Sequence, residues 1–573
     1  MEIVEEFPTD AVHLVIRSRA IGVPPGQQDN IVGRLQRIEE LLLPTDDQLS
    51  SVNTTPTPRQ SVYAAAAPIV EASPQHSASS FTANQVITPP SPPYTIFGYS
   101  LDGFSRLGLE PCPAPLLPLC SNDTEEELEL ELFSEEALFG GPQTNIELCD
   151  LDLGSRRCWQ LEQTFSRDVL PWCPIIEHRE CSDLVTRVAE GGFDTSNPRT
   201  SLVLFMLALG AFAKESHYTS ARIDSLPGLD YFRAACQILD RDRASRHTLM
   251  HVQGKILTAF YLLFCLKPIH AFEAIHSASS ELLILLQLRG RHPSDSIYQE
   301  KLNRAYWTCY LIEHELQPYV SYSSRLLQSR RDFVPLPLSD YDEPGMYWFL
   351  SEITLRGIIC SFSTRDGSMG PTAWNPPSFA PKLIEELASQ MAEWHANLAR
   401  PIRFFLDSPT PSVDITALRP LLDPHKVFLR AQYYAVHATL HWPSVVQLLN
   451  MPRVPEPQDT AAGDMSPLSV SAAKSVQYSV LHVYAVESLL QERHLMLFAN
   501  ITGLFCITML LLCIYELPEL AEIQHPRIVD AVILGWRCLR IWDDEPNVKS
   551  RLRRVEDLMK AKGIEVPVEN MYI

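Results

Sequence analysis

Five side chains of the types that bind zinc gather in one stretch of the chain: Cys149, Cys158, Cys173, His178 and Cys181. Thiolates and imidazoles are the usual zinc ligands, and structural zinc sites bring them in closely spaced pairs. The spacing here matches no common zinc pattern. We therefore interpret the cysteines as unrelated buried thiols, with a local metal cluster as the alternative, and we expect no metal and no other cofactor.

The sequence contains no recognisable catalytic motif. His314-Glu315 begins like the His-Glu-x-x-His motif of zinc proteases, but the chain continues HELQP and no second histidine follows at the required helical turn. A Gly-x-Ser-x-Gly elbow, a Walker loop and a dinucleotide fingerprint are also absent from the sequence. We predict that the protein is not an enzyme. A small-molecule-binding or catalytic helical protein, with a pocket between helices, is the less favoured alternative.

The charge of the chain argues against direct binding to DNA. Its 573 residues include 69 acidic and 47 basic ones, which gives a net charge of −22. Binding to a phosphate backbone depends on Lys and Arg that displace counterions, so contact with DNA requires a partner or a local basic surface. The 13 scattered cysteines, together with an acidic start that lacks the apolar core of a secretory signal, favour a reduced compartment, the cytoplasm or the nucleus.

Residues 29–43 carry a short zipper pattern. Ile31, Leu35, Ile38 and Leu42 recur at the a and d positions of two heptads. Two heptads are too few for a stable isolated helix, so we expect this helix to become ordered on a partner chain or on the body. We predict a homodimer or a heterodimer with a related regulator. A surface helix that covers part of a core is the alternative.

Residues 44–122 form a linker rich in Pro, Ser, Thr and Ala, with runs such as SPQHSASS and TPPSPPY. Such a composition buries too little apolar surface to offset the entropy of ordering, so we predict that the linker is disordered. Residues 1–28, at the other end of the zipper, carry no pattern that defines a structure.

The next segment, residues 123–139, reads DTEEELELELFSEEALF and combines acidic with bulky apolar residues. Acidic residues keep apolar side chains in water until a partner groove receives them, which is the behaviour of an activation segment that folds on the transcription machinery. A solvated lid helix on the body is the alternative. The residues expected to contribute to activation are Glu127, Leu128, Glu129, Leu132, Phe133, Leu138 and Phe139.

Residues 140–573 read as one large α-helical body. From about Asn197 onward, segments such as TSLVLFMLALGAFAKE and LMHVQGKILTAFYLLFCL repeat apolar residues at spacings of three and four, without strand-like alternation. Prolines between positions 371 and 424 divide this series into two halves. Helices are also expected at 230–241, 296–318, 379–399, 424–450, 467–494, 498–515, 526–542 and 548–562.

One of these segments, Leu495 to Tyr515, is uncharged and long enough to span a bilayer. Asn500, Thr502, Gly503 and Thr508 interrupt it, and no Lys or Arg belt follows its end. We therefore interpret it as a buried core helix and expect no contact with a membrane.

The stretch NRAYWTCYLIEHEL, followed by SSRLLQSRRDFVPLPLSDYDEP, resembles the central block of the fungal-specific transcription factor domain. This domain is the middle homology region of fungal regulators that carry a six-cysteine binuclear zinc cluster. Ser324 and Arg325 stand where the family has a Gly-Arg-Pro turn, and the resemblance covers roughly residues 199–515. The matching residues are Arg304, Tyr306, Trp307, Tyr310, Glu313, Asp332, Leu336 and Pro337.

The resemblance implies an all-α regulatory domain, a nuclear location and control of transcription, often of a secondary-metabolite gene cluster. Relatives read DNA through two Cys-x-x-Cys pairs that bind zinc, and their dimers set the half-site spacing. This sequence contains no Cys-x-x-Cys pair, so the family's zinc ligands are missing from the gene product or from the gene model. We expect contact with DNA through a partner. The alternative is a cluster-less co-regulator or inhibitor that pairs with a DNA-binding relative.

Overall fold

The computed structural model describes most of the expected helical body and little of what precedes it. The predicted zipper with Ile31, Leu35, Ile38 and Leu42 lies outside the described residues, and so does most of the linker and of the acidic segment. The described residues are 95–96, 99–100, 131, 138–139, 147–218, 225–241, 247–288, 296–320, 327–338, 343–363, 381–407, 420–451 and 465–565.

The first group of helices ends with α12, and within it η3 is a π-helical turn that continues α6. Its elements are η2 (Leu148–Asp150), α6 (Ser155–Thr164), η3 (Phe165–Val169), η4 (Leu170–Trp172), α7 (His178–Glu190), α8 (Pro198–Lys214), α9 (Leu229–Arg241), α10 (Leu249–Phe264), α11 (Pro268–Leu288) and α12 (Ser296–Val320).

The second group begins after the loop that follows α12. Its elements are η8 (Gln328–Phe333), α13 (Met346–Ser363), α14 (Pro381–Ala396), η10 (Arg400–Ile402), α15 (Pro424–Asn450), α16 (Pro467–Val486), η12 (Glu487–Leu490), α17 (Leu497–Ile514), η13 (Pro518–Ile523), α18 (Ile528–Arg540) and α19 (Pro546–Ala561).

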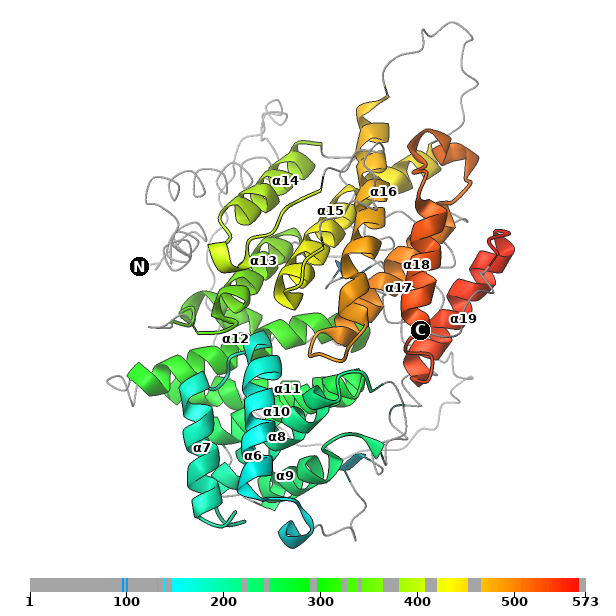
Figure 1. Cartoon of the computed structure of the whole chain (residues 1–573). Helices are drawn as coiled ribbons and strands as arrows, with labels where there is room; N and C mark the ends of the chain where they lie inside the picture. The colour runs from blue at the N-terminus through cyan, green and yellow to red at the C-terminus, as the bar shows by residue number, and fades with distance from the viewer. Residues whose placement is uncertain are drawn as a thin grey trace, which may run out of the picture.

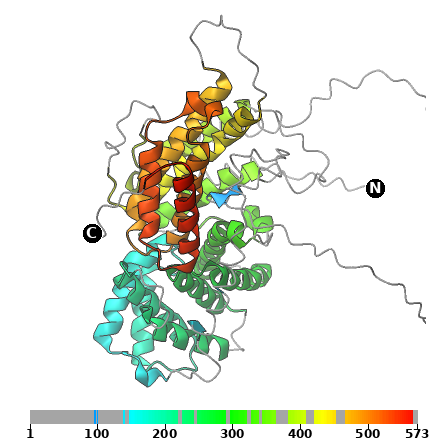
Figure 2. The ribbon, with the colours of Figure 1, turned by 90° about the vertical axis from the view of Figure 1, so that its right-hand side faces the viewer.

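The two groups are stacked along the long axis of the molecule. In Figure 1, α6 to α11 gather in the lower part and α13 to α18 in the upper part, with α12 between them. The same division is visible in the view turned by 90° (Figure 2). Within the second group α15 and α16 pack side by side along most of their length (Figure 1).

Helix ends follow the local sequence. α8 begins after Asn197, whose side chain accepts a hydrogen bond from the backbone N–H of Arg199, and Pro198 occupies the first helical position. Asn is a favoured N-cap and Pro fits the first turn, where its missing N–H costs nothing. α8 is buried on nearly every side because its apolar residues surround the whole helix, as expected for the centre of a helical group.

The uncharged segment near residue 500 forms α17, in which 94% of the residues are buried. It packs against α16, α18 and α19. By length and composition alone α17 could cross a membrane. Its neighbours cover it inside the body, as expected for a core helix.

The prediction of an all-α fold is confirmed. Within the predicted linker the structure describes two short strands, β1 (Thr95–Ile96) and β2 (Tyr99–Ser100), which pair antiparallel with Thr95 opposite Ser100. β1 lies against α17. Helices α6, α7 and α13 were not predicted from the sequence, in which the first helix is expected at about Asn197 and none between 318 and 379.

A buried arginine joins the two groups of helices. Arg493, just before α17, forms an ion pair with Glu545 at 2.5 Å and donates to the carbonyl oxygens of Tyr218 and Phe264 at 2.5 and 2.6 Å. Its guanidinium also lies over the ring of Trp542, 5.1 Å from the centroid. Because Arg493 reaches both α10 and the start of α19, it fixes the orientation of one group relative to the other.

Candidate functional site

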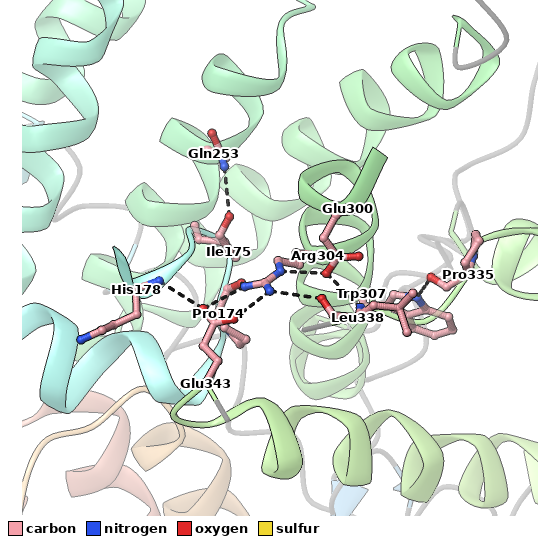
Figure 3. A network of polar contacts seen from close by, with 10 residues as sticks. All are labelled: Pro174, Ile175, His178, Gln253, Glu300, Arg304, Trp307, Pro335, Leu338 and Glu343. Carbon is pink, nitrogen blue, oxygen red and sulfur yellow. Dashed lines mark hydrogen bonds and ion pairs between the residues drawn. The ribbon is translucent and has the colours of Figure 1, made fainter. Parts of the chain in front are cut away.

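The residues that carry the family resemblance lie on α12 and on the loop that follows it. Arg304 is 2% exposed and donates from Nη2 to Glu343 Oε2 at 2.7 Å, from Nη1 to Glu343 Oε1 at 3.0 Å and from Nε to Glu300 Oε1 at 2.9 Å. Burial alone would lower the pKa of Arg304, but the carboxylates of Glu343 and Glu300 raise it overall. The guanidinium is therefore held charged inside the protein by a bidentate ion pair with Glu343 and by the carboxylate of Glu300 (Figure 3).

Arg304 and its carboxylate partners contact three separate parts of the chain. The guanidinium also donates to the carbonyl oxygens of Pro174 and Leu338 at 3.3 and 3.4 Å. Glu343 Oε1 accepts the backbone N–H of His178 at 3.1 Å, and His178 is the first residue of α7 (Figure 3). One carboxylate thus caps a helix and neutralises an arginine at the same time.

Close packing next to Glu343 requires a glycine. Gly345 has a φ of +82°, and a Cβ at this position would lie 1.9 Å from the carbonyl oxygen of Pro171. A side chain is therefore excluded both by the left-handed backbone and by contact with the η4 segment.

The aromatic residues of the same helix hold the loop that follows it. Tyr306 donates from its hydroxyl to the carbonyl oxygen of Leu327 at 2.6 Å, and Trp307 donates from Nε1 to that of Pro335 at 2.9 Å. Leu336 is buried, and so is its neighbour Pro337. The backbone of residues 327–338 is therefore attached to α12 at both ends.

The other motif residues have different environments. Tyr310 is buried beside Trp307, with ring centroids 5.3 Å apart. Glu313 is buried, and desolvation raises its pKa to about 7. Asp332 is exposed and is not among the hydrogen-bond partners of Arg304 named above. Ser324 and Arg325, at the altered turn, lie outside the described residues.

We call Arg304, Glu300, Glu343 and Trp307, with the carbonyl groups they bind, the Arg304 clamp. Its charges and donors face one another in the interior, and Arg304 is nearly inaccessible to solvent. Such an arrangement holds elements in place and presents no reactive group to a substrate. It connects α7, α12, the 327–338 loop and the start of α13 (Figure 3).

The sequence identified only part of this clamp. Glu300 could have been found from its i, i+4 spacing to Arg304 on one helix. Glu343 lies 39 residues from Arg304, and Pro174 lies 130 residues away, with no local pattern that connects them. Long-range partners of this kind are fixed by packing and not by spacing.

The cysteines considered as zinc ligands are not brought together. Cys158, Cys173 and Cys181 are buried while Cys149 is exposed. Burial raises the pKa of Cys181 to about 12 and that of Cys173 well above its usual value, which disfavours the thiolate that a metal requires. In the described part of the chain no three His, Cys, Asp or Glu residues are arranged to hold a metal ion.

Three residues of the acidic segment are described, and all three contact the body. Glu131 is 5% exposed, and its Oε1 accepts the backbone N–H groups of Ile269 and His270 at 2.7 and 3.1 Å. Leu138 is fully buried in the hydrophobic core. Phe139 is half-buried and packs against the same core. No role was predicted for Glu131 from the sequence, because nothing local distinguishes it from its acidic neighbours.

Comparisons with known proteins give one partial similarity. The chain is 26% identical over 225 residues to a protein of Aspergillus rugulosus named "Putative transcription factor ecdB". The match covers 38% of this chain and 37% of that protein, so it spans little more than a third of either. No family model matches the sequence, and no solved structure matches it.

Proposed function

We propose that this protein is a nuclear transcription regulator related to the fungal zinc-cluster factors, and that it controls a pathway-specific set of genes such as a secondary-metabolite cluster. The observation that carries the proposal is the similarity over 225 residues to a protein named as a transcription factor. The family-like residues of α12 support it, because Arg304, Tyr306 and Trp307 are all used to hold one helix and its following loop.

In this proposal the parts of the chain have separate roles. The zipper residues Ile31, Leu35, Ile38 and Leu42 join two subunits, and the segment 123–139 recruits the transcription machinery. The helical body restrains or senses, and contact with DNA comes through the partner. The net charge of −22 supports the last point, because an acidic chain is repelled by the phosphate backbone.

An electrophoretic mobility shift with the purified full-length protein and promoter DNA tests the role of the partner. The proposal expects no sequence-specific shift by this chain alone and a shift when a DNA-binding relative is added. Specific binding by this chain alone would contradict contact through a partner. A matched protein with Ile31, Leu35, Ile38 and Leu42 changed to Ala is expected to lose the shift in the mixture.

A second candidate is a co-regulator that inhibits a DNA-binding relative by pairing with it. The predicted zipper at residues 29–43 is the part that would pair with the relative. The two functions differ in the sign of their effect on transcription. Deletion of the gene lowers target transcripts if the protein activates, and raises them if it blocks its partner.

A further inference from the structure

The body contains a surface that receives the acidic segment. It is made by Phe232 and Arg233 on α9 and by Ile269 and His270 at the start of α11; we call these four residues the α9–α11 socket. The described residues of the acidic segment that occupy it, Glu131, Leu138 and Phe139, are all in helical conformation. All three residues contact the socket, although Glu131 lies seven and eight positions before Leu138 and Phe139.

Glu131 binds the amino-terminal end of α11. The first N–H groups of a helix have no partner inside the helix and carry partial positive charge. The Glu131 carboxylate accepts two of them, those of Ile269 and His270, and the His270 ring donates from Nε2 to the Glu131 carbonyl oxygen at 3.3 Å. A residue of the acidic segment therefore caps the amino-terminal end of a helix in the body, more than a hundred residues away in the sequence.

Leu138 and Phe139 make the second half of the contact. Arg233 donates from Nε to the carbonyl oxygen of Leu138 at 3.2 Å. The Phe139 ring lies 5.8 Å from that of Phe232 and meets the His270 ring edge-on at 5.9 Å. The Leu138 side chain has no exposed surface, so a partner protein cannot contact it while it occupies the socket.

From these contacts we infer that the α9–α11 socket is a docking surface for a segment with a carboxylate followed seven and eight residues later by a Leu-Phe pair. Glu131, Leu138 and Phe139 of this chain's own acidic segment occupy it, and Leu138 and Phe139 are thereby hidden from partners. The inference rests on the proposed function, since the masked residues Leu138 and Phe139 are those expected to recruit the transcription machinery. The machinery then binds only the undocked fraction, which lowers its apparent affinity by that fraction.

The test changes the socket and leaves the segment intact. The full-length chain is fused to a heterologous DNA-binding module and compared with its Arg233→Ala and His270→Ala variants in a reporter assay. Loss of one hydrogen bond and its packing contacts is expected to raise the undocked population, and with it the reporter signal, about fivefold. Arg241→Ala, an exposed arginine at the end of the same helix, is the matched control and is expected to leave the signal unchanged.

Hydrogen exchange on the purified full-length chain gives a second readout that does not depend on transcription. Amides of residues 131–139 are expected to be protected in the unmodified chain and in Arg241→Ala, and to exchange about fivefold faster in the two socket variants. Unchanged exchange in both socket variants would overturn the docking surface. If dilution of the unmodified chain removes the protection, the occupant is the segment of a second copy and the inference of masking within one chain is wrong.

The two readouts separate failure of this inference from failure of the proposed function. The isolated segment 123–139 fused to the DNA-binding module serves as the reference, together with its Leu128→Ala, Leu132→Ala, Phe139→Ala triple variant. If the reference activates and the triple variant does not, but the socket variants leave the reporter unchanged, masking is wrong and activation stands. If the reference is silent while exchange responds as expected, the segment docks on the body but has no recruiting role, and the masking of an activation segment is refuted.

Discussion

The Arg304 clamp and the α9–α11 socket both bury carboxylates, but they compensate the charge differently. In the clamp the Glu343 carboxylate meets the guanidinium of Arg304 at 2.7 Å, and each ion neutralises the other. In the socket Glu131 accepts hydrogen bonds from two backbone N–H groups, and the charge of Lys267 acts on it alongside them. Its pKa is raised to about 8, chiefly by desolvation, which the two hydrogen bonds only partly oppose.

The comparison of Glu343 with Glu131 shows that a buried glutamate can form either a permanent contact or one that can be released. A buried ion pair that loses one partner leaves an uncompensated charge, so the elements of the clamp separate only when the protein unfolds. A carboxylate on a helix terminus contributes less and can return to water as a charged group. The clamp therefore belongs to the scaffold, and the socket is suited to regulation.

The largest expected effect is the loss of the clamp. Arg304→Met leaves the Glu343 carboxylate buried without its cation, and we expect the free energy of unfolding to fall by about 3–5 kcal/mol. Chemical denaturation of the full-length protein measures the change. Arg156→Met, an exposed arginine on α6, is the control and should fall within about 0.5 kcal/mol of the unmodified protein. Equal midpoints for the two variants would show that the clamp does not hold the scaffold.

The next effect concerns Gly345, beside the clamp. Gly345→Ala adds a Cβ that would lie 1.9 Å from the Pro171 carbonyl oxygen, in addition to the strain of a positive φ. We expect a loss of about 3 kcal/mol in the free energy of unfolding. Gly192 has a φ of +69° but no atom within 4 Å of the added Cβ, so Gly192→Ala isolates the strain and is expected to cost about 1 kcal/mol. A cost for Gly345→Ala no greater than that of Gly192→Ala would argue against the close contact.

A smaller effect is expected at the indole of Trp307. Trp307→Phe keeps an aromatic ring but removes the hydrogen bond to the Pro335 carbonyl oxygen. The expected loss in the free energy of unfolding is about 1 kcal/mol, because the hydrogen bond from the buried indole is lost. A thermal melt measures it, and amides of residues 327–338 should exchange faster than in the unmodified chain. If the melting temperature and the exchange of this loop stay the same, the indole does not hold the loop.

The last effect is the pH dependence of docking in the socket, which concerns the acidic segment and leaves the stability of the body unchanged. A carboxyl whose pKa is raised from 4.5 to about 8 on docking binds a proton more tightly when docked, so its contribution is complete below pH 4.5 and is lost as the pH rises through about 8. In the part of the chain that the structure describes, the charged or titratable groups that face it include Lys267, Glu273 and the His270 ring. Protection of residues 131–139, corrected for intrinsic exchange, should therefore fall between pH 6 and 8.5.

Glu131→Gln tests the cause of this pH dependence. The amide can accept the same N–H bonds without titrating, so the fall in protection between pH 6 and 8.5 should become shallower. Glu190→Gln, an exposed glutamate at the end of α7, should keep the dependence of the unmodified chain. An identical fall in Glu131→Gln would assign the effect to His270, Lys267 or Glu273.

The sequence predicts helices well where a long apolar pattern surrounds the helix. α8, α10 and α17 were expected from such patterns, and the structure has them within a few residues of the predicted ends. α7 was missed because only Cys181, Leu184, Val185 and Val188 form its buried face among polar neighbours. α13 was missed because it is rich in aromatic and β-branched residues, whose helical propensity is weak, and its helical state depends on packing against α12 and α14.

The same contrast applies to the candidate site. The sequence singled out Arg304, Tyr306 and Trp307 through their resemblance to a family pattern, but not the carbonyl groups and the Glu343 carboxylate that they bind. It singled out Leu138 and Phe139 through their composition, but not the surface that receives them. Partners distant in the sequence are determined by how helices pack, and no spacing rule connects Glu131 to the start of α11.

Genome-wide chromatin immunoprecipitation of the tagged full-length protein, in cells grown under conditions that induce a specialised pathway, tests the proposed function most directly. The account predicts enrichment at a small set of promoters and its loss when Ile31, Leu35, Ile38 and Leu42 are changed to Ala, because DNA contact depends on a paired subunit. Absence of enrichment at any promoter under any growth condition would contradict the account.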